Sequence, residues 1–208
     1  MAKSSVKFVC SNCGAQFAAW AGRCSTCGEW NTLTEEEIII SRGSGSKASA
    51  GKTLKSFNPS QITKENKVKR LSTGISDVDE VLGGGVVPGS IILIAGEPGI
   101  GKSTLLLDVA ARLAKNTSVL YVSGEESTHQ VGMRAKRLEL GASKLEIAAS
   151  SSAEDIAASI RTGKYGVVFV DSIQTMTVDG VASSAGSVSQ ITNSTQVLMS
   201  AGKQSNTA

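Results

Sequence analysis

The chain has 208 residues, of which 40% are hydrophobic and 19% are charged, and its formal net charge is +3. This composition indicates a globular protein and excludes a disordered chain, and the length allows one sizeable core beside a small accessory module. No run of about 18 apolar residues occurs and no signal segment opens the chain, so we expect a cytoplasmic protein with no membrane partner.

The first 33 residues contain all four cysteines, arranged as two C-x2-C pairs with ten residues between them. Two such pairs can offer four thiolates at the corners of a tetrahedron, which predicts a structural Zn²⁺ site with no open coordination position. A module this small buries too little apolar surface to fold alone, so the metal would supply its folding energy. Two disulfides are one alternative, which a reducing cytoplasm disfavours. A redox-active pair is a weaker alternative, since there are two pairs and neither opens an obvious helix. The predicted zinc ligands are Cys10, Cys13, Cys24 and Cys27.

Residues 1–70 divide into a four-cysteine module, residues 1–33, and a flexible basic linker, residues 34–70. We expect Trp20 and Trp30 to form the core of the module rather than stacking platforms for bases, and "EEEIIIS" (35–41) to be a short strand that ends it. Residues 41–70 hold eight basic side chains and one acidic one. Such a segment is either a solvated, extended linker or a sequence-independent contact for nucleic-acid phosphates.

From residue 71 the pattern alternates between apolar runs typical of strands and amphipathic stretches typical of helices. A parallel sheet with helices on both faces, an α/β fold, is therefore predicted for residues 71–208. Ser151 and Glu154 form a capping box for the helix at 152–162. On the first helix, the apolar face is expected to comprise Leu105, Leu106, Val109, Ala110 and Leu113. The predicted strands are 90–96, 118–124, 144–150 and 165–172, and the predicted helices are 103–115, 128–140 and 152–162.

"GEPGIGKST" fits the phosphate-binding loop pattern and lies between a predicted buried strand and a helix, the context that the motif requires. Its glycines let backbone amides turn toward a phosphate at the positive end of the helix dipole. Lys102 is expected to reach the β- and γ-phosphates, and the Ser103 hydroxyl to bind Mg²⁺. The predicted nucleotide-binding residues are Gly96, Glu97, Pro98, Gly99, Ile100, Gly101, Lys102, Ser103 and Thr104.

Hydrolysis needs acidic residues beside this loop, and three candidates follow predicted strands. Asp171 ends the apolar run "VVFVD" and is expected to hold the Mg²⁺ water shell. Glu125 and Glu126 follow "VLYVSG", at the carboxyl edge of the sheet where ligands of open α/β folds bind. One of the two is expected to polarise the attacking water, so the predicted catalytic residues are Lys102, Glu125 and Glu126.

These motifs together resemble a known family. The stretch from "LSTGISDVDEVLGGG" through "GEPGIGKST" resembles the RecA-like ATPase core, and the cysteine module with "VSGEES" and "VFVDSIQTM" resembles the bacterial RadA (Sms) recombination and repair family. The resemblance implies an ATP-dependent motor with Mg²⁺ that forms homo-hexameric rings, promotes branch migration and is stimulated by single-stranded DNA. It also implies branched DNA and a RecA-type recombinase as partners, and Glu125 as the catalytic glutamate with Glu126 as second choice. Residues 177–190 correspond to a mobile, DNA-facing loop, although they contain no lysine or arginine.

The family pattern continues beyond "LMSAGKQSNTA" into another core strand, a "KNRFG" motif and a domain resembling that of Lon protease. In a RecA-like sheet, that strand lies between the strands that end at Asp171 and Gly96. The resemblance therefore implies that residues 1–208 are a truncated gene product or a fragment, whose sheet has a gap. The zinc module is then expected to be intact, and ATP hydrolysis is in doubt. Two alternatives stay open: a zinc-ribbon module that binds DNA or protein without turnover, and a RecA-like switch ATPase that acts on proteins.

Overall fold

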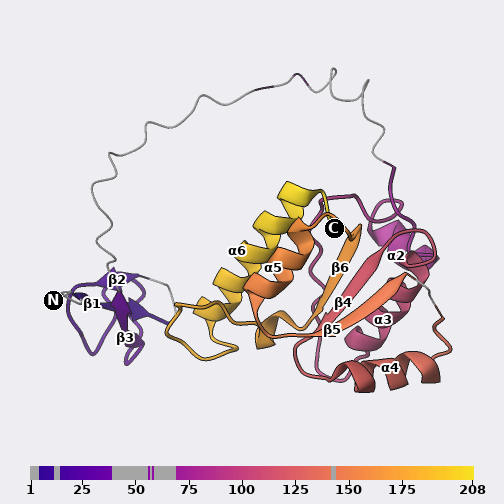
Figure 1. The fold of residues 1–208 in the computed structure, drawn as a ribbon. Coiled ribbons are helices and arrows are strands. Elements are labelled where there is room, and N and C mark those ends of the chain that lie inside the picture. The colour runs from indigo at the N-terminus through magenta and orange to yellow at the C-terminus, as the bar shows by residue number, and fades with distance from the viewer. Residues whose placement is uncertain (1–4, 12–14, 39–55, 57, 59–68, 142–143) are drawn as a thin grey trace. The chain divides into compact units, whose positions relative to one another are not determined.

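The computed structural model describes residues 5–11, 15–38, 56, 58, 69–141 and 144–208. The chain divides into two compact units, residues 1–57 and residues 58–208. The first unit contains an antiparallel sheet with the strand order β2-β1-β3, in which Cys10 at the end of β1 lies opposite Leu33 at the start of β3 (Figure 1). The strands are β1 (Ser5–Cys10), β2 (Gln16–Phe17) and β3 (Leu33–Ile38).

The second unit is built around a parallel sheet with the order β5-β4-β6, as the alternating pattern predicts (Figure 1). Every residue of β4 is buried, which suits the uninterrupted apolar run of a central parallel strand. The strands are β4 (Val119–Ser123), β5 (Leu145–Ala149) and β6 (Val167–Asp171). The helices are α2 (Ser76–Val81), α3 (Lys102–Leu113), α4 (Thr128–Arg137), α5 (Ala153–Arg161), the 3-10 turn η1 (Ile173–Thr175) and α6 (Val188–Ser205).

Helices cover both faces of this sheet, which confirms the α/β prediction. On one face lie α3 and α4 (Figure 1). They pack against alternate residues of β4, including Val119 and Tyr121. On the other face α5 and α6 pack against Leu120 and Val122. The buried residues of α3 are Leu107, Val109, Ala110, Ala111 and Leu113, whereas Leu105, predicted to face the core, is 38% exposed.

The predicted buried strand at 90–96 is wrong in the described structure. No strand forms there, and the exposed fractions of Ile91, Ile92, Leu93 and Ile94 lie between 40% and 78%. A strand needs ladder partners, and no segment among the described residues pairs with this one. The second edge of β6 instead pairs with the last residue of the chain: Ala208 donates its amide to Gly166 O at 3.1 Å and accepts from Val168 N at 2.8 Å.

Side-chain caps define where α4, α5 and α6 of this unit begin. The helix predicted at 152–162 is confirmed as α5, but its cap is Ser152 rather than Ser151, because Ser152 Oγ accepts from Asp155 N at 3.1 Å. At α4 a full capping box forms between Ser127 and Gln130. Each hydroxyl satisfies an amide that the first helical turn leaves without a partner.

The loop at 177–190 is tied to the start of α6 by one buried side chain. Gln190 is 2% exposed. Its Oε1 accepts from Val178 N at 2.8 Å, and its Nε2 donates to Val181 O and Ser183 O at 3.0 Å each. These contacts stabilise one arrangement of a loop that its Gly/Ser-rich sequence alone would leave mobile.

We expect Gln190→Leu to lower the free energy of unfolding of the second unit by about 1–3 kcal/mol, because the loop's polar groups lose their partners in a buried place. Urea unfolding followed by far-UV circular dichroism measures the change. Gln196→Leu is the matched control, since Gln196 lies on the same helix and is exposed. Equal stabilities of the two variants would contradict this account of the loop.

Candidate nucleotide and zinc sites

The predicted phosphate loop leads directly into α3. Gly101 is the N-cap residue of that helix, with a φ of 99°, and Gly99 has a φ of 79°. A Cβ added to either glycine meets no heavy atom within 4 Å, so the left-handed backbone rather than crowding requires glycine here. The loop therefore has the backbone form that lets amides face an anion in front of the helix.

Lys102, the first residue of α3, folds back over this loop. Its Nζ donates to the carbonyls of Gly96 and Glu97, at 2.8 Å each. The loop itself is exposed to solvent, so an incoming phosphate group meets the ammonium without displacing a packed side chain. Exchange of two neutral carbonyl acceptors for charged phosphate oxygens favours binding, since hydrogen bonds between charged groups are stronger.

The fold brings Asp171, Glu125 and Glu126 to the edge of the sheet toward which the N-terminus of α3 is directed. A short turn connects α3 to β4, and the helix packs on the sheet, so it runs back against the strand. Its N-terminus is therefore directed toward the carboxyl ends of the strands. At that edge Ser123 of β4 is in register with Asp171 of β6, and Gly124 N donates to Asp171 O at 2.9 Å.

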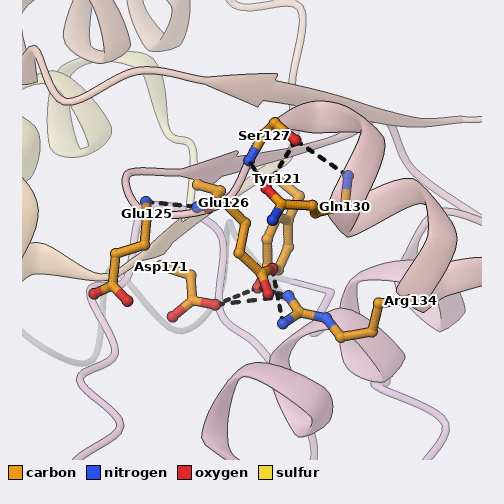
Figure 2. A network of polar contacts seen from close by, with 8 residues as sticks. Tyr121, Glu125, Glu126, Ser127, Gln130, Arg134 and Asp171 are labelled. Carbon is orange, nitrogen blue, oxygen red and sulfur yellow. Dashed lines mark hydrogen bonds and ion pairs between the residues drawn. The ribbon is translucent and has the colours of Figure 1, made fainter.

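Asp171 is held by a tyrosine that sequence reasoning did not select. Tyr121 OH donates to Asp171 Oδ2 at 2.6 Å (Figure 2). Burial, and then the hydrogen bond to Asp171, raise the pKa of Tyr121 above its ordinary value, so the phenol stays protonated and remains a donor. The contact fixes the direction of a carboxylate whose side chain is only 17% exposed.

The two adjacent glutamates have different surroundings. Glu126 Oε2 forms an ion pair with Arg134 Nη1 at 2.9 Å. Glu125 points away from that guanidinium (Figure 2). Its Oε1 accepts from Ser172 Oγ at 3.2 Å. The structure thus engages Glu126 in an ion pair with α4 and leaves Glu125 exposed beside the residue that follows Asp171.

Arg134 is the second residue that the sequence analysis missed. It lies on α4 next to the buried residues Val131 and Ala135, and its side chain is only 14% exposed. Its Nη2 donates to Tyr121 OH at 3.3 Å and lies 3.9 Å from Asp171 Oδ2. An arginine on the buried side of an amphipathic helix was the available signal, because a buried charge requires a partner.

The residues present suit a bound Mg²⁺ in their donor chemistry, since Mg²⁺ prefers carboxylate, hydroxyl and water oxygens. Both contacts recorded for the Asp171 carboxylate fall on Oδ2. Among the described residues, Oδ1 has no hydrogen-bond partner and can face a metal-bound water. Ser103 lies in the first turn of α3, beside Lys102, as the phosphate-loop pattern requires.

Three of the four predicted zinc ligands form a cluster in the first unit, and the fourth, Cys13, lies outside the described residues. The sulfurs of Cys10, Cys24 and Cys27 all lie within 4.8 Å of one another. Cys10 Sγ and Cys27 Sγ are 3.7 Å apart, which is too long for a disulfide bond. Thiolates bound to one Zn²⁺ at about 2.3 Å each lie roughly 3.8 Å apart in a tetrahedron, so the cluster fits zinc.

The prediction that Trp20 and Trp30 form the core of this module is wrong. They are 59% and 67% exposed, and they flank Gly22. In the part of this module that the structure describes, the buried residues are instead Cys10, Cys24 and Leu33. A core this small gives two indoles no interior to fill, so the cysteine cluster takes the central position.

Comparisons with known proteins support an ATPase domain and a zinc ribbon in this chain. A family model of ATPases described as "KaiC" matches residues 71–164, and a model described as "Rubredoxin metal binding domain" matches residues 8–35. Similar curated proteins are named "DNA repair protein RadA". That of Pseudomonas aeruginosa is 43% identical over 209 residues, covering 100% of this chain and 46% of the relative. Those of Brucella abortus and Escherichia coli are 44% and 46% identical, covering 100% and 88% of this chain and 46% and 41% of the relatives.

The chain matches the N-terminal part of RadA. It spans less than half the length of these RadA relatives, between 41% and 46%. The KaiC-like ATPase region carries the phosphate loop and both glutamates, and the zinc-ribbon region carries the cysteine cluster. In the described part of the chain, no helix has the length and apolar character to cross a membrane.

Proposed function

We propose that this chain is part of an ATP-dependent DNA repair motor of the RadA type, in which ATP hydrolysis drives the processing of branched recombination intermediates. The observation that supports it best is the grouping of Asp171, Glu125 and Glu126 at one edge of the sheet, toward which the phosphate-loop helix begins. A nucleotide held at 96–104 would then have Asp171 to hold Mg²⁺ and a glutamate to orient the attacking water.

In this proposal Lys102 and the loop amides bind the β- and γ-phosphates, while Ser103 and Asp171 hold Mg²⁺, which offsets phosphate charge when bound. Glu125 orients a water molecule for in-line attack on the γ-phosphorus and accepts its proton. The water oxygen bonds to phosphorus as the bond to the β-phosphate oxygen breaks, giving ADP and phosphate. Zn²⁺ has a structural role in the first unit.

The DNA partners in the proposal are single-stranded and branched DNA, the protein partner is a RecA-type recombinase, and the assembly is a homo-hexameric ring. The names of the relatives support a role in DNA repair. Because residues 177–190 contain no lysine or arginine, we assign the phosphate contacts to the basic segment at 41–70. Most of that segment lies outside the described residues.

The test is ATP turnover by the purified chain with and without single-stranded DNA, at two salt concentrations. Stimulation by DNA that weakens as salt rises supports the motor, since phosphate contacts release counterions. Turnover that is insensitive to DNA favours the alternative of a switch ATPase acting on proteins, to which the KaiC-type match of residues 71–164 lends weight.

Within that assay, Glu125→Gln is expected to lower kcat about 100-fold or more, because the amide cannot accept a proton from water. Glu126→Gln is its matched neighbour and is expected to keep kcat within about fivefold of the unmodified chain, since Glu126 contacts Arg134 rather than the proposed water. A larger loss for Glu126→Gln than for Glu125→Gln would reverse the assignment of the two residues.

The second candidate is a zinc-ribbon module that binds DNA or protein without turnover. The exposed segment Ile91–Ile94, which pairs with no strand among the described residues, favours it. The phosphate loop follows that segment directly, and a strand there would normally anchor the loop. This function predicts stoichiometric zinc and DNA or protein binding, with no ATP hydrolysis under any of the conditions above.

A further inference from the structure

We infer that Arg134 serves as a built-in cation between Asp171 and Glu126, so that a divalent metal ion enters this site only together with a nucleotide. Arg134 is thus a positioning residue, and the inference rests on the proposed role of Asp171 beside Mg²⁺. It explains why two adjacent glutamates behave differently: one is held by the guanidinium and the other is left for chemistry.

The guanidinium lies between groups from three places in the fold. Nη1 is 2.9 Å from Glu126 Oε2 in the loop after β4, and Nη2 is 3.9 Å from Asp171 Oδ2 at the end of β6. Nη2 also donates to Tyr121 OH at 3.3 Å, and that hydroxyl in turn donates to Asp171 (Figure 2). Two carboxylates therefore share one cation, and one of them, Asp171, also accepts a hydrogen bond from a neutral donor.

The position of Arg134 is fixed from behind by its own helix. The capping box of Ser127 and Gln130 sets the start of α4 at Thr128, nearly two turns before Arg134. Val131 and Ala135 beside it are buried in the core. Arg134 Nε is buried without a hydrogen-bond partner among the described residues, which costs free energy. The contacts of the two Nη atoms offset that cost and hold the guanidinium in this place.

Electrostatics gives this arrangement a consequence for metal binding. Two carboxylates that converge without a cation attract a divalent ion, which prefers oxygen ligands. Arg134 and Asp171 are 14% and 17% exposed, so solvent screens their interaction only in part. With the arginine in place, the attraction for a metal is weakened until phosphate oxygens add negative charge and ligands of their own.

The experiment titrates MnCl₂ into the zinc-loaded chain without nucleotide and follows free Mn²⁺ by electron paramagnetic resonance. The unmodified chain is expected to bind Mn²⁺ weakly. Arg134→Met is expected to bind it at least about tenfold more tightly, because Asp171 and Glu126 then lose the cation that they share. Arg134→Lys keeps the charge and is expected to behave like the unmodified chain.

The double variant Arg134→Met with Glu126→Gln separates this role from a merely structural one. Removing the second carboxylate is expected to reverse the gain, whereas general loosening of the fold would leave it. An unchanged Mn²⁺ affinity in Arg134→Met, or a gain that survives Glu126→Gln, overturns the inference. Circular dichroism checks that Arg134→Met folds, and Arg134→Lys tests the charge requirement if it does not: Mn²⁺ binding by folded Arg134→Lys as weak as that of the unmodified chain supports the inference, and tenfold tighter binding overturns it.

Failure of the proposed function shows in a different measurement. A nucleotide affinity that does not change when Lys102 is substituted would contradict the nucleotide site. The Mn²⁺ titration contains no nucleotide and does not involve that residue.

Discussion

Lys102→Ala is expected to weaken the binding of Mg²⁺-ATP about 100-fold, because the loop loses its one ammonium contact to the phosphates. Among the described residues, this ammonium donates to the carbonyls of Gly96 and Glu97, both in an exposed loop. The substitution therefore changes the free energy of unfolding by less than about 1 kcal/mol, as exposed hydrogen bonds contribute little. Loss of binding with stability retained is the signature of a ligand contact.

Fluorescence titration with an N-methylanthraniloyl ATP analogue measures the affinity, and thermal unfolding measures the stability. Lys115→Ala is the matched control, since Lys115 follows the far end of the same helix and is exposed. It removes the same charge from the chain at a place distant from the loop. Affinities of the two variants within about threefold of each other would show that Lys102 does not contact the phosphates.

Sequence patterns predicted the elements of the second unit wherever local signals and burial agree. The run "VLYVS" became the fully buried β4, and the run ending in Asp171 became β6 beside it. The run at 90–96 is equally apolar and failed as a prediction, because strand formation depends on neighbours as well as on composition. Apolar content predicts that a segment seeks burial; pairing decides whether it is buried.

The site shows the same limit at the level of single side chains. The patterns placed Asp171 and both glutamates at the sheet edge, yet they could not separate Glu125 from Glu126 without the resemblance. That separation depends on Arg134, which is eight positions beyond Glu126 and reaches it only because α4 packs on the sheet. Tyr121 was hidden for a similar reason, as a strand residue gives no sign that its hydroxyl will meet a carboxylate.

The other large expected effect concerns the first unit, where Cys24→Ser is expected to abolish zinc binding and unfold the module. Cys24 is completely buried, and among the described residues of this unit the buried core otherwise consists of Cys10 and Leu33. Structural Zn²⁺ sites of this kind contribute about 10–16 kcal/mol to folding in small peptides, far more than such a core can supply. The second unit has its own core and is expected to keep its unfolding temperature within about 2 °C.

Zinc content per chain measures the loss of the metal, and tryptophan fluorescence measures the unfolding of the module. Both tryptophans of the chain, Trp20 and Trp30, lie in the first unit, so emission excited at a tryptophan-selective wavelength reports that unit alone. Ser25→Ala is the matched control, because Ser25 is exposed and adjacent to Cys24 in the same turn. One zinc ion retained per chain in Cys24→Ser would mean that the metal is held by other residues. Zinc lost while the fluorescence and anisotropy stay unchanged would mean that the module folds without it, and the structural role of the metal would then be wrong.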